Sequence, residues 1–213
     1  INTFIIFIFM GFVGAQDVFK PTTKDELQTA VSLWVSDESS ALSTYGEINT
    51  WDVSLITNMA YLFQDRTTFN ADIGNWNVSN VTNMHQMFFE ATNFNQDISN
   101  WNVSLVQNMH SMFFKAANFN QDISNWNVSN VTVMSGMFES AESFNQDLSG
   151  WDVSNVTNMS WVFRNADALS DGNKCAIHLS FLSNDVWPYD WEESCQNNYS
   201  LSFGGDGDYT HLD

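Results

Sequence analysis

The chain has 213 residues, of which 44% are hydrophobic and 15% aromatic, so it can build an apolar core and does not have the composition of a disordered chain. The chain has six Lys and Arg and 25 Asp and Glu, which gives a net charge of −19. This charge excludes nucleic acid and anionic lipid as natural partners and favours cations or basic proteins. Acidity that serves only solubility is the alternative.

The first fifteen residues, INTFIIFIFMGFVGA, form an uncharged apolar run that ends in small residues. This pattern predicts a secretory signal peptide over residues 1–15, incomplete at its start because the initiator Met and the positive region are missing. The run is short for a membrane span, although a membrane anchor stays an alternative. We therefore expect a secreted or cell-surface protein with no integral membrane segment after cleavage.

Residues 16–44 are expected to form a helical amino-terminal cap. Thr23 and Glu26 have the spacing of a capping box, which marks the start of a helix. Leu27, Ala30, Val31 and Trp34 then fall on one helical face. Such a helix would cover the first open face of a repeat stack.

A repeat of 25 residues follows, and it defines five units over residues 45–170. The five units begin at Trp51, Trp76, Trp101, Trp126 and Trp151. A fixed period of this length is typical of a solenoid, in which neighbouring units bury one continuous core. The period-two Trp-x-Val step predicts a short strand, and the spacing of Met109, Met112, Phe113 and Ala116 predicts a short helix. The expected class is an α/β repeat solenoid of strand–turn–short helix units.

The repeated pattern V-T-x-M-x-x-M-F-x-x-A-x-x-F-N-x-D-I-S-x-W-x-V-S resembles the BspA-like leucine-rich repeat surface proteins, in the branch rich in Asn, Trp and Met. The resemblance covers about residues 45–170. It implies a right-handed, leucine-rich-repeat-like stack with terminal caps. It also implies a secreted or surface-attached protein that adheres to host or matrix proteins.

After Leu169 the repeat ends, and residues 171–197 are expected to form a carboxyl-terminal cap. Cys175 and Cys195 are the two cysteines, and a secreted context permits a disulfide between them that contributes about 3 kcal/mol. Residues 198–213, which include SLSFGGDGDYTHLD, resemble the opening strand of a laminin-G-like jelly-roll domain. A disordered acidic tail is the alternative.

Three ladders of polar residues repeat with the units, and each has its own predicted role. An Asn follows the Phe of each unit and is expected to hold stacked turns together; these residues are Asn70, Asn95, Asn120 and Asn145. One Asp per unit is a candidate for calcium binding, with turn hydrogen bonds as the alternative; these are Asp72, Asp97, Asp122 and Asp147. The candidate ligand-binding face comprises Asp52, Asn77, Asn102, Asn127 and Asp152 with Ser54, Ser79, Ser104, Ser129 and Ser154.

No nucleophile motif, phosphate loop or metal-ligand spacing is found, so we expect no enzyme activity in these residues and no cofactor other than calcium. The sequence predicts non-catalytic adhesion or recognition, with a protein or carbohydrate ligand bound by the exposed ladder face. Two alternatives stay open. One is a structural surface spacer without a ligand, and the other is a binding module of a larger secreted hydrolase.

Overall fold

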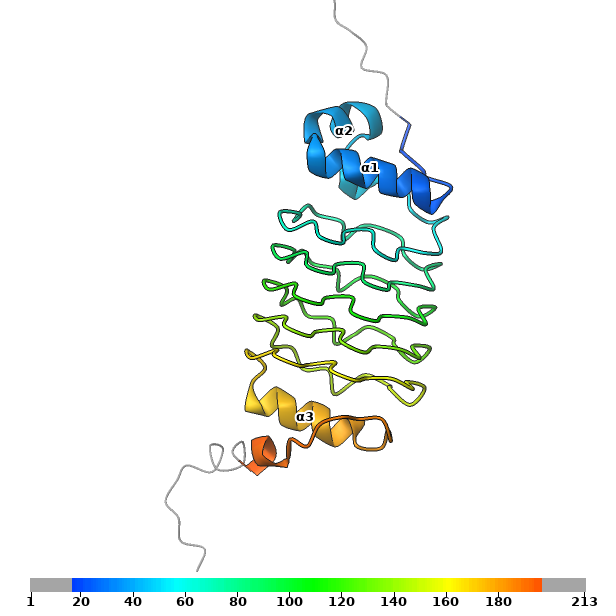
Figure 1. Cartoon of the computed structure of the whole chain (residues 1–213). Helices are drawn as coiled ribbons and strands as arrows, with labels where there is room; N and C mark the ends of the chain where they lie inside the picture. Colours follow the sequence, from blue (N-terminus) through cyan, green and yellow to red (C-terminus); the bar gives the residue numbers. More distant parts are fainter. Residues whose placement is uncertain (1–16, 197–213) are drawn as a thin grey trace, which may run out of the picture.

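The structure, a computed structural model, describes residues 17–196. Helices lie at the two ends of this region, and a stack of coils lies between them (Figure 1). The named elements are α1 (Lys24–Ser36), α2 (Glu38–Tyr45), the 3-10 helix η1 (Ile48–Thr50) and α3 (Asp171–Phe181). The predicted signal peptide at 1–15 and the predicted jelly-roll strand or tail at 198–213 lie outside the described residues.

The five coils begin at the five repeated Trp residues, and they meet through single bridges instead of strands. The parallel bridges join Asn58 to Asn83, Asn83 to Asn108, Asn108 to Val133 and Val133 to Asn158, so each joins residues 25 apart. Between residues 17 and 196 there is no named strand, and the coils themselves contain no helix. The prediction of an α/β, leucine-rich-repeat-like solenoid of strand–turn–short helix units is therefore wrong.

The Trp-x-Val step is not a strand because its hydrogen bonds stay local. The N–H of Trp101 donates to the carbonyl of Ile98, and the N–H of Val106 donates to the carbonyl of Val103. Both bonds span three residues, as in a β-turn. The extended segment therefore ends before it can pair with a neighbouring coil.

The predicted short helix is also absent, because alternate backbone N–H groups point at the next coil. In the third coil the donors are Met109, Ser111, Phe113 and Lys115, and the acceptors are the carbonyls of Val133, Ser135, Met137 and Glu139, at 2.8–2.9 Å. The intervening N–H groups of Met112 and Phe114 donate only three residues back, at 3.2 Å. An α-helix needs every N–H for its own i−4 carbonyl, so this lateral bonding excludes it. We call the stacked segments 59–66, 84–91, 109–116, 134–141 and 159–166 the turn ridge.

Two residues per coil of the turn ridge have a positive φ, between 50° and 65°. The first row is Tyr61, Gln86, Ser111, Gly136 and Trp161, and the second is Asp65, Glu90, Lys115, Ser140 and Asn165. Residues other than Gly rarely occupy this left-handed region, which costs about 1–2 kcal/mol each. The lateral hydrogen bonds offset that cost, since each residue of both rows up to the fourth coil donates its N–H to the next coil.

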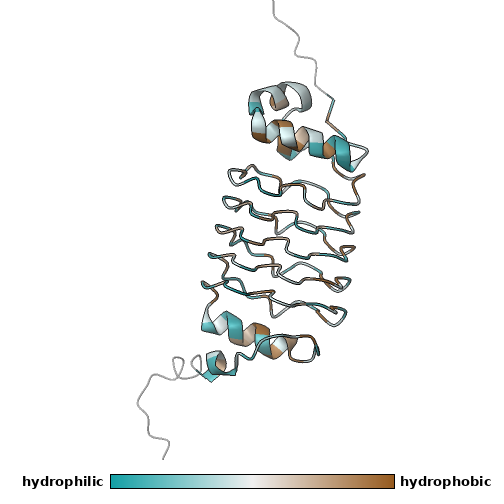
Figure 2. Ribbon diagram, in the orientation of Figure 1, coloured by the Kyte–Doolittle hydropathy of each residue, from teal (hydrophilic) through white to brown (hydrophobic). Residues whose placement is uncertain are grey.

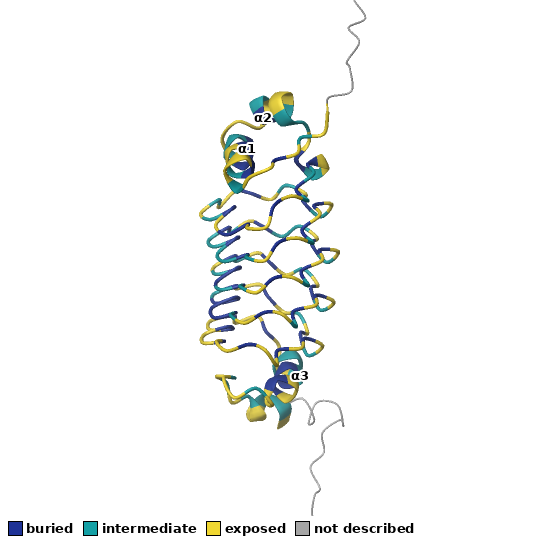
Figure 3. Cartoon of the chain, turned by 90° about the vertical axis from the view of Figure 1, so that its right-hand side faces the viewer, coloured by how far each residue is buried: buried dark blue, intermediate teal, exposed yellow. Residues whose placement is uncertain are grey.

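The interior of the stack is a set of parallel side-chain ladders. Figure 3 shows buried residues in every coil along the stack. Every coil contributes the repeated Trp, Val, Met and Phe positions, as expected from the sequence. Phe88 stacks on Phe113 of the next coil with ring centroids 5.5 Å apart, and on Phe94 of its own coil at 4.0 Å. The core is therefore continuous from one cap to the other.

The amino-terminal cap begins as the sequence predicts. The side chain of Thr23 accepts from the N–H of Glu26, and the Glu26 carboxylate accepts from the N–H of Thr23, which confirms the capping box. The predicted apolar face of α1 is buried, and Trp34 meets Trp51 edge to face at 5.9 Å. Hydrophobic and hydrophilic residues both occur on α1 and on every coil in Figure 2. The buried face of helix α1 therefore packs against the first coil, and its other face is left for solvent.

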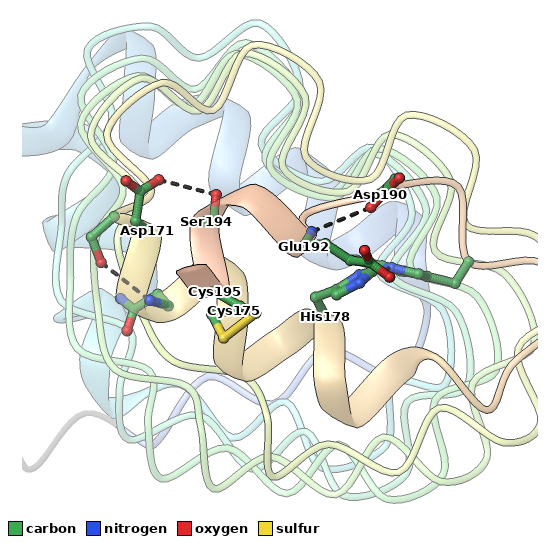
Figure 4. Close-up of a disulfide and its surroundings, with 10 residues drawn as sticks. Asp171, Cys175, His178, Asp190, Glu192, Ser194 and Cys195 are labelled. Carbon is green, nitrogen blue, oxygen red and sulfur yellow. Dashed lines mark hydrogen bonds between the residues drawn. A yellow bond between two sulfur atoms is a disulfide. The ribbon is translucent and has the colours of Figure 1, made fainter. Parts of the chain in front are cut away.

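The carboxyl-terminal cap contains α3 and the segment that follows it. The disulfide between Cys175 and Cys195 is confirmed, and the Ser194 hydroxyl donates to Asp171 at 3.0 Å beside it (Figure 4). Tyr189 accepts the N–H of Phe163 from the last coil at 2.9 Å. Within residues 17–196 no helix is long and apolar enough to cross a membrane.

Candidate functional site

The predicted ligand-binding face consists of five turns, one per coil. Each Asp or Asn Oδ1 accepts the N–H of the Ser two residues later; the pairs are Asp52–Ser54, Asn77–Ser79, Asn102–Ser104, Asn127–Ser129 and Asp152–Ser154, at 3.0–3.2 Å. We call these residues the Asx row. The Oδ1 acceptors are therefore used by the fold. The hydroxyls of Ser54, Ser129 and Ser154 also bond the Asx side chain of their own turn. The groups left for a ligand are the second oxygen of Asp152, the Nδ2 groups of the three Asn and the hydroxyls of Ser79 and Ser104.

The first member of the Asx row has a further partner. The Lys20 ammonium lies 2.7 Å from the Asp52 carboxylate, and the N–H of Asp52 donates to the carbonyl of Phe19. The hydrogen bond from Lys20, followed by those from Ser54, lowers the pKa of Asp52 to about 2. The segment that precedes α1 therefore occupies this end of the row.

The calcium candidates also form turns. Each Asp carboxylate accepts a backbone N–H two residues on; the pairs are Asp72–Gly74, Asp97–Ser99, Asp122–Ser124 and Asp147–Ser149, at 2.9–3.0 Å. Hydrogen bonds from Ser124 lower the pKa of Asp122, against a smaller opposing effect of the Asp97 charge. In the described part of the chain no group of three His, Cys, Asp or Glu is placed to hold a metal ion. Calcium binding here stays a prediction.

The Asn ladder has the structural role expected from the sequence. The Oδ1 of Asn70, Asn95, Asn120 and Asn145 accepts the backbone N–H of Asn95, Asn120, Asn145 and Ser170 respectively, at 2.8–2.9 Å. A Gln side chain joins the ladder in two coils: Nε2 of Gln121 and of Gln146 donates to the backbone carbonyl and Oδ1 of the Asn 26 residues earlier. The ladder thus satisfies backbone groups between coils.

The turn ridge carries side chains that the sequence did not single out as a site. Tyr61 meets His85 edge to face at 4.8 Å, and His85 stacks on His110 at 4.9 Å. His110 Nδ1 shares a hydrogen bond of 2.6 Å with the Ser135 hydroxyl. Burial, together with the neighbouring His110, lowers the pKa of His85. The result is a row of rings that runs along the stack.

Basic residues gather on the same ridge. Lys24, Lys115 and Arg164 lie over the rings of Tyr61, Phe114 and Trp161, at 5.4, 5.1 and 4.8 Å. Lys115 also pairs with Glu90 at 2.9 Å, and Arg164 pairs with the buried Glu139. With Arg66, four of the six Lys and Arg of the sequence lie on or against the turn ridge. This surface is therefore less negative than the chain as a whole.

The ridge was missed because its outward side chains do not repeat. The first left-handed row reads Tyr, Gln, Ser, Gly and Trp from coil to coil, whereas the Asx row reads only Asp or Asn. A search for repeated polar residues selects positions that serve the stack. The ridge could have been found by searching instead for positions that vary between units and carry a large aromatic residue in some of them.

The comparison with known families matches the repeat region. The model of one family, described as "Mycoplasma protein of unknown function, DUF285", matches residues 32–124 and again residues 96–178. Two overlapping matches fit a chain made of repeated units. No curated protein and no solved structure matches the chain. Because the two matches together span more than half of its length, the chain belongs to the DUF285 repeat family.

Proposed function

We propose that this chain is a non-catalytic recognition module that binds a protein partner through the turn ridge. Trp161 is the observation that carries the proposal: its side chain is 58% exposed and the Arg164 guanidinium covers one face of its ring. Trp, Tyr and Arg are the residues that most often dominate the energy of protein interfaces. Tyr61, 44% exposed, provides a second anchor at the other end of the ridge.

The ridge is suited to binding because its side chains are already held in place. Phe89 and Phe114 stack at 4.5 Å, and the His85–His110 pair stacks beside the Tyr61 ring. A side chain fixed by its neighbours loses little conformational entropy when a partner arrives. The ridge is thus a preorganised surface with aromatic groups at its centre.

The charge of the chain supports a basic partner. A net charge of −19 attracts positively charged proteins over a distance, whereas the ion pairs on the ridge leave the contact surface itself with little net charge. We therefore expect an association rate that falls as salt is added. Exposure at the cell surface or outside the cell is part of this proposal, and it is supported by the resemblance of the repeat to BspA-like adhesion proteins.

The experiment compares the two surfaces. The full chain is tested against purified extracellular-matrix proteins and a glycan array, together with the variants Tyr61→Ala/Trp161→Ala and Asn102→Lys/Asn127→Lys. We expect a basic matrix protein to bind, the ridge variant to lose at least about tenfold in affinity, and the Asx-row variant to retain it. Thermal melts establish that both variants are folded.

Two other results would overturn the proposal. Loss of binding only in the Asx-row variant would move recognition to the surface predicted from the sequence. Absence of binding to every probe, together with self-assembly of the chain, would favour a structural spacer.

A further inference from the structure

The Asn ladder has an unfilled place at its amino-terminal end. In later coils the residue after the repeated Phe or Leu donates its backbone N–H to the Oδ1 of the Asn 25 residues earlier. Asn70 is the first ladder residue, and residue 25 positions before it is Tyr45, in α2. Among residues 17–196 the N–H of Asn70 has no hydrogen-bond partner. The backbone donor at the start of the ladder therefore has no protein acceptor within the described residues, and it lies at an exposed position.

A cavity of about 390 Å³ lies at this place. Trp34, at the end of α1, and Glu38, at the start of α2, line it from the cap, and Thr68 and Asn70 line it from the first coil. Because the cap lies where a preceding coil would stack, the cavity occupies the position of the missing ladder group. Its volume is in the range of sites that bind small molecules or single side chains.

Ala71 keeps the cavity open. In the next three coils the corresponding residue is a Gln, and Gln121 and Gln146 extend their amide toward the preceding coil. A Gln at position 71 would extend into the space that Ala71 lines. Two carboxamides found in later coils are therefore missing here. Tyr45 stands where the preceding ladder Asn would be, and Ala71 stands where later coils have a Gln.

We propose that this cavity binds the carboxamide of an asparagine or glutamine side chain presented by a peptide. Its oxygen accepts the N–H of Asn70, as the Oδ1 of Asn120 accepts the N–H of Asn145 at 2.8 Å inside the stack. Its NH₂ group donates to the Glu38 carboxylate. The indole of Trp34 contacts the apolar part of the side chain.

The acceptors of the cap select an amide over an acid. Glu38 is a carboxylate, and the carbonyl of Val35 lies in the last turn of α1, where helix carbonyls have no intrahelical donor. An aspartate or glutamate side chain would be repelled, whereas a primary amide offers two donors to these two acceptors. The site is separate from the turn ridge, so it does not depend on the function proposed above.

The test is an NMR titration of the full ¹⁵N-labelled chain with N-acetyl-glutamine-N-methylamide. We expect the Asn70 amide resonance to shift and saturate with a Kd on the order of 1 mM, as expected for a ligand of this size. The Asn120 amide, inside the ladder, is expected not to move. The glutamate analogue is expected to bind at least about tenfold more weakly.

Variants separate this site from nonspecific effects. Ala71→Gln fills the cavity with the chain's own carboxamide and is expected to abolish the shift, whereas Ala168→Gln, the same change at an exposed residue of the last coil, is expected to leave it. Glu38→Gln is expected to reduce the discrimination against the glutamate analogue, with the carbonyl of Val35 left in place. A saturating titration in the Ala71→Gln variant, or an unmoved Asn70 resonance in the wild type, would overturn the proposal. Binding of N-acetylglucosamine without binding of the glutamine probe would overturn it as well.

Discussion

The indole N–H of Trp101 donates to the backbone carbonyl of Ile73, 28 residues earlier, with 3.2 Å between Nε1 and the oxygen. The same bond joins Trp76 to Ile48, Trp126 to Ile98 and Trp151 to Ile123. The repeated Trp is therefore both a core side chain and a link to a stacked segment 28 residues earlier in the chain. A buried carbonyl that no strand partner satisfies receives its donor from the indole.

Replacement of Trp101 by Phe tests this link. A stacked ring is kept, but the smaller ring fills less of the core and the carbonyl of Ile73 loses its donor while it stays buried. We expect a loss of at least about 1–3 kcal/mol in the free energy of unfolding. Urea denaturation measures the loss. Trp161→Phe is the matched control, because Trp161 is 58% exposed, and it is expected to change stability by less than about 0.5 kcal/mol. Equal effects of the two substitutions would show that the indole bond contributes nothing.

The Asn ladder predicts a different pattern at an exposed site. Asn120→Ala removes the acceptor of the Asn145 N–H and of the Gln146 amide, and we expect it to cost about 1 kcal/mol. Asn120→Asp keeps an acceptor oxygen and is expected to cost less. Asn125→Ala, at an exposed residue of the same coil, is the control, with an expected change within about 0.5 kcal/mol. Thermal and urea unfolding of the three variants check the order.

The left-handed positions of the turn ridge predict a stabilising substitution. Ser140 has a φ of 57°, so Ser140→Gly removes backbone strain of about 1–2 kcal/mol from the folded chain. The greater conformational entropy of Gly in the unfolded chain lowers the stability by about 0.4–1 kcal/mol. We expect a net gain of about 1 kcal/mol. Ser143→Gly, at an exposed residue without a positive φ, is expected to lose stability instead. Destabilisation by both substitutions would contradict the strained backbone at Ser140.

The sequence was sufficient for the features that depend on local or repeated chemistry. Thr23 and Glu26 mark the start of α1 because a capping box is a short-range signal, and the repeated Trp, Met and Phe positions are core because every coil needs them. The pairing of Cys175 with Cys195 could be predicted because the chain has only two cysteines.

The backbone conformation of the repeated unit could not be predicted from the sequence in the same way. Met109, Met112 and Phe113 have helical spacing, yet their N–H groups divide between the next coil and the local turn. Non-glycine residues such as Ser111 and Lys115 in the left-handed region give no signal in the sequence. The stacking of coils overrides local preference, and it also decides which side chains reach the surface of the ridge.

His85 predicts a pH dependence of stability. Burial lowers its pKa below the ordinary value of 6.5, and the stacked His110 acts in the same direction. The unfolded chain therefore binds a proton at a higher pH than the folded chain, so stability is full above about pH 6.5 and falls as the pH drops toward the lowered pKa. His85→Phe keeps a ring against Tyr61 and His110 and is expected to flatten this part of the profile. Urea denaturation between pH 8 and pH 5 measures the slope, and identical slopes for the variant and the wild type would contradict the prediction.

The disulfide predicts an effect on the carboxyl-terminal cap. Cys175 and Cys195 close a loop of 20 residues, and Cys175→Ser/Cys195→Ser is expected to cost about 3 kcal/mol because the unfolded chain regains the freedom of that loop. Addition of dithiothreitol is expected to lower the Tm of the wild type to that of the double variant, and to leave the Tm of the double variant unchanged. Since Tyr189 and Trp191 of the cap contact Phe163 of the last coil, the loss is expected to expose that end of the core first. Hydrogen exchange that increases at residues 159–166 before residues 84–91 is the expected result, and uniform exchange along the stack would contradict it.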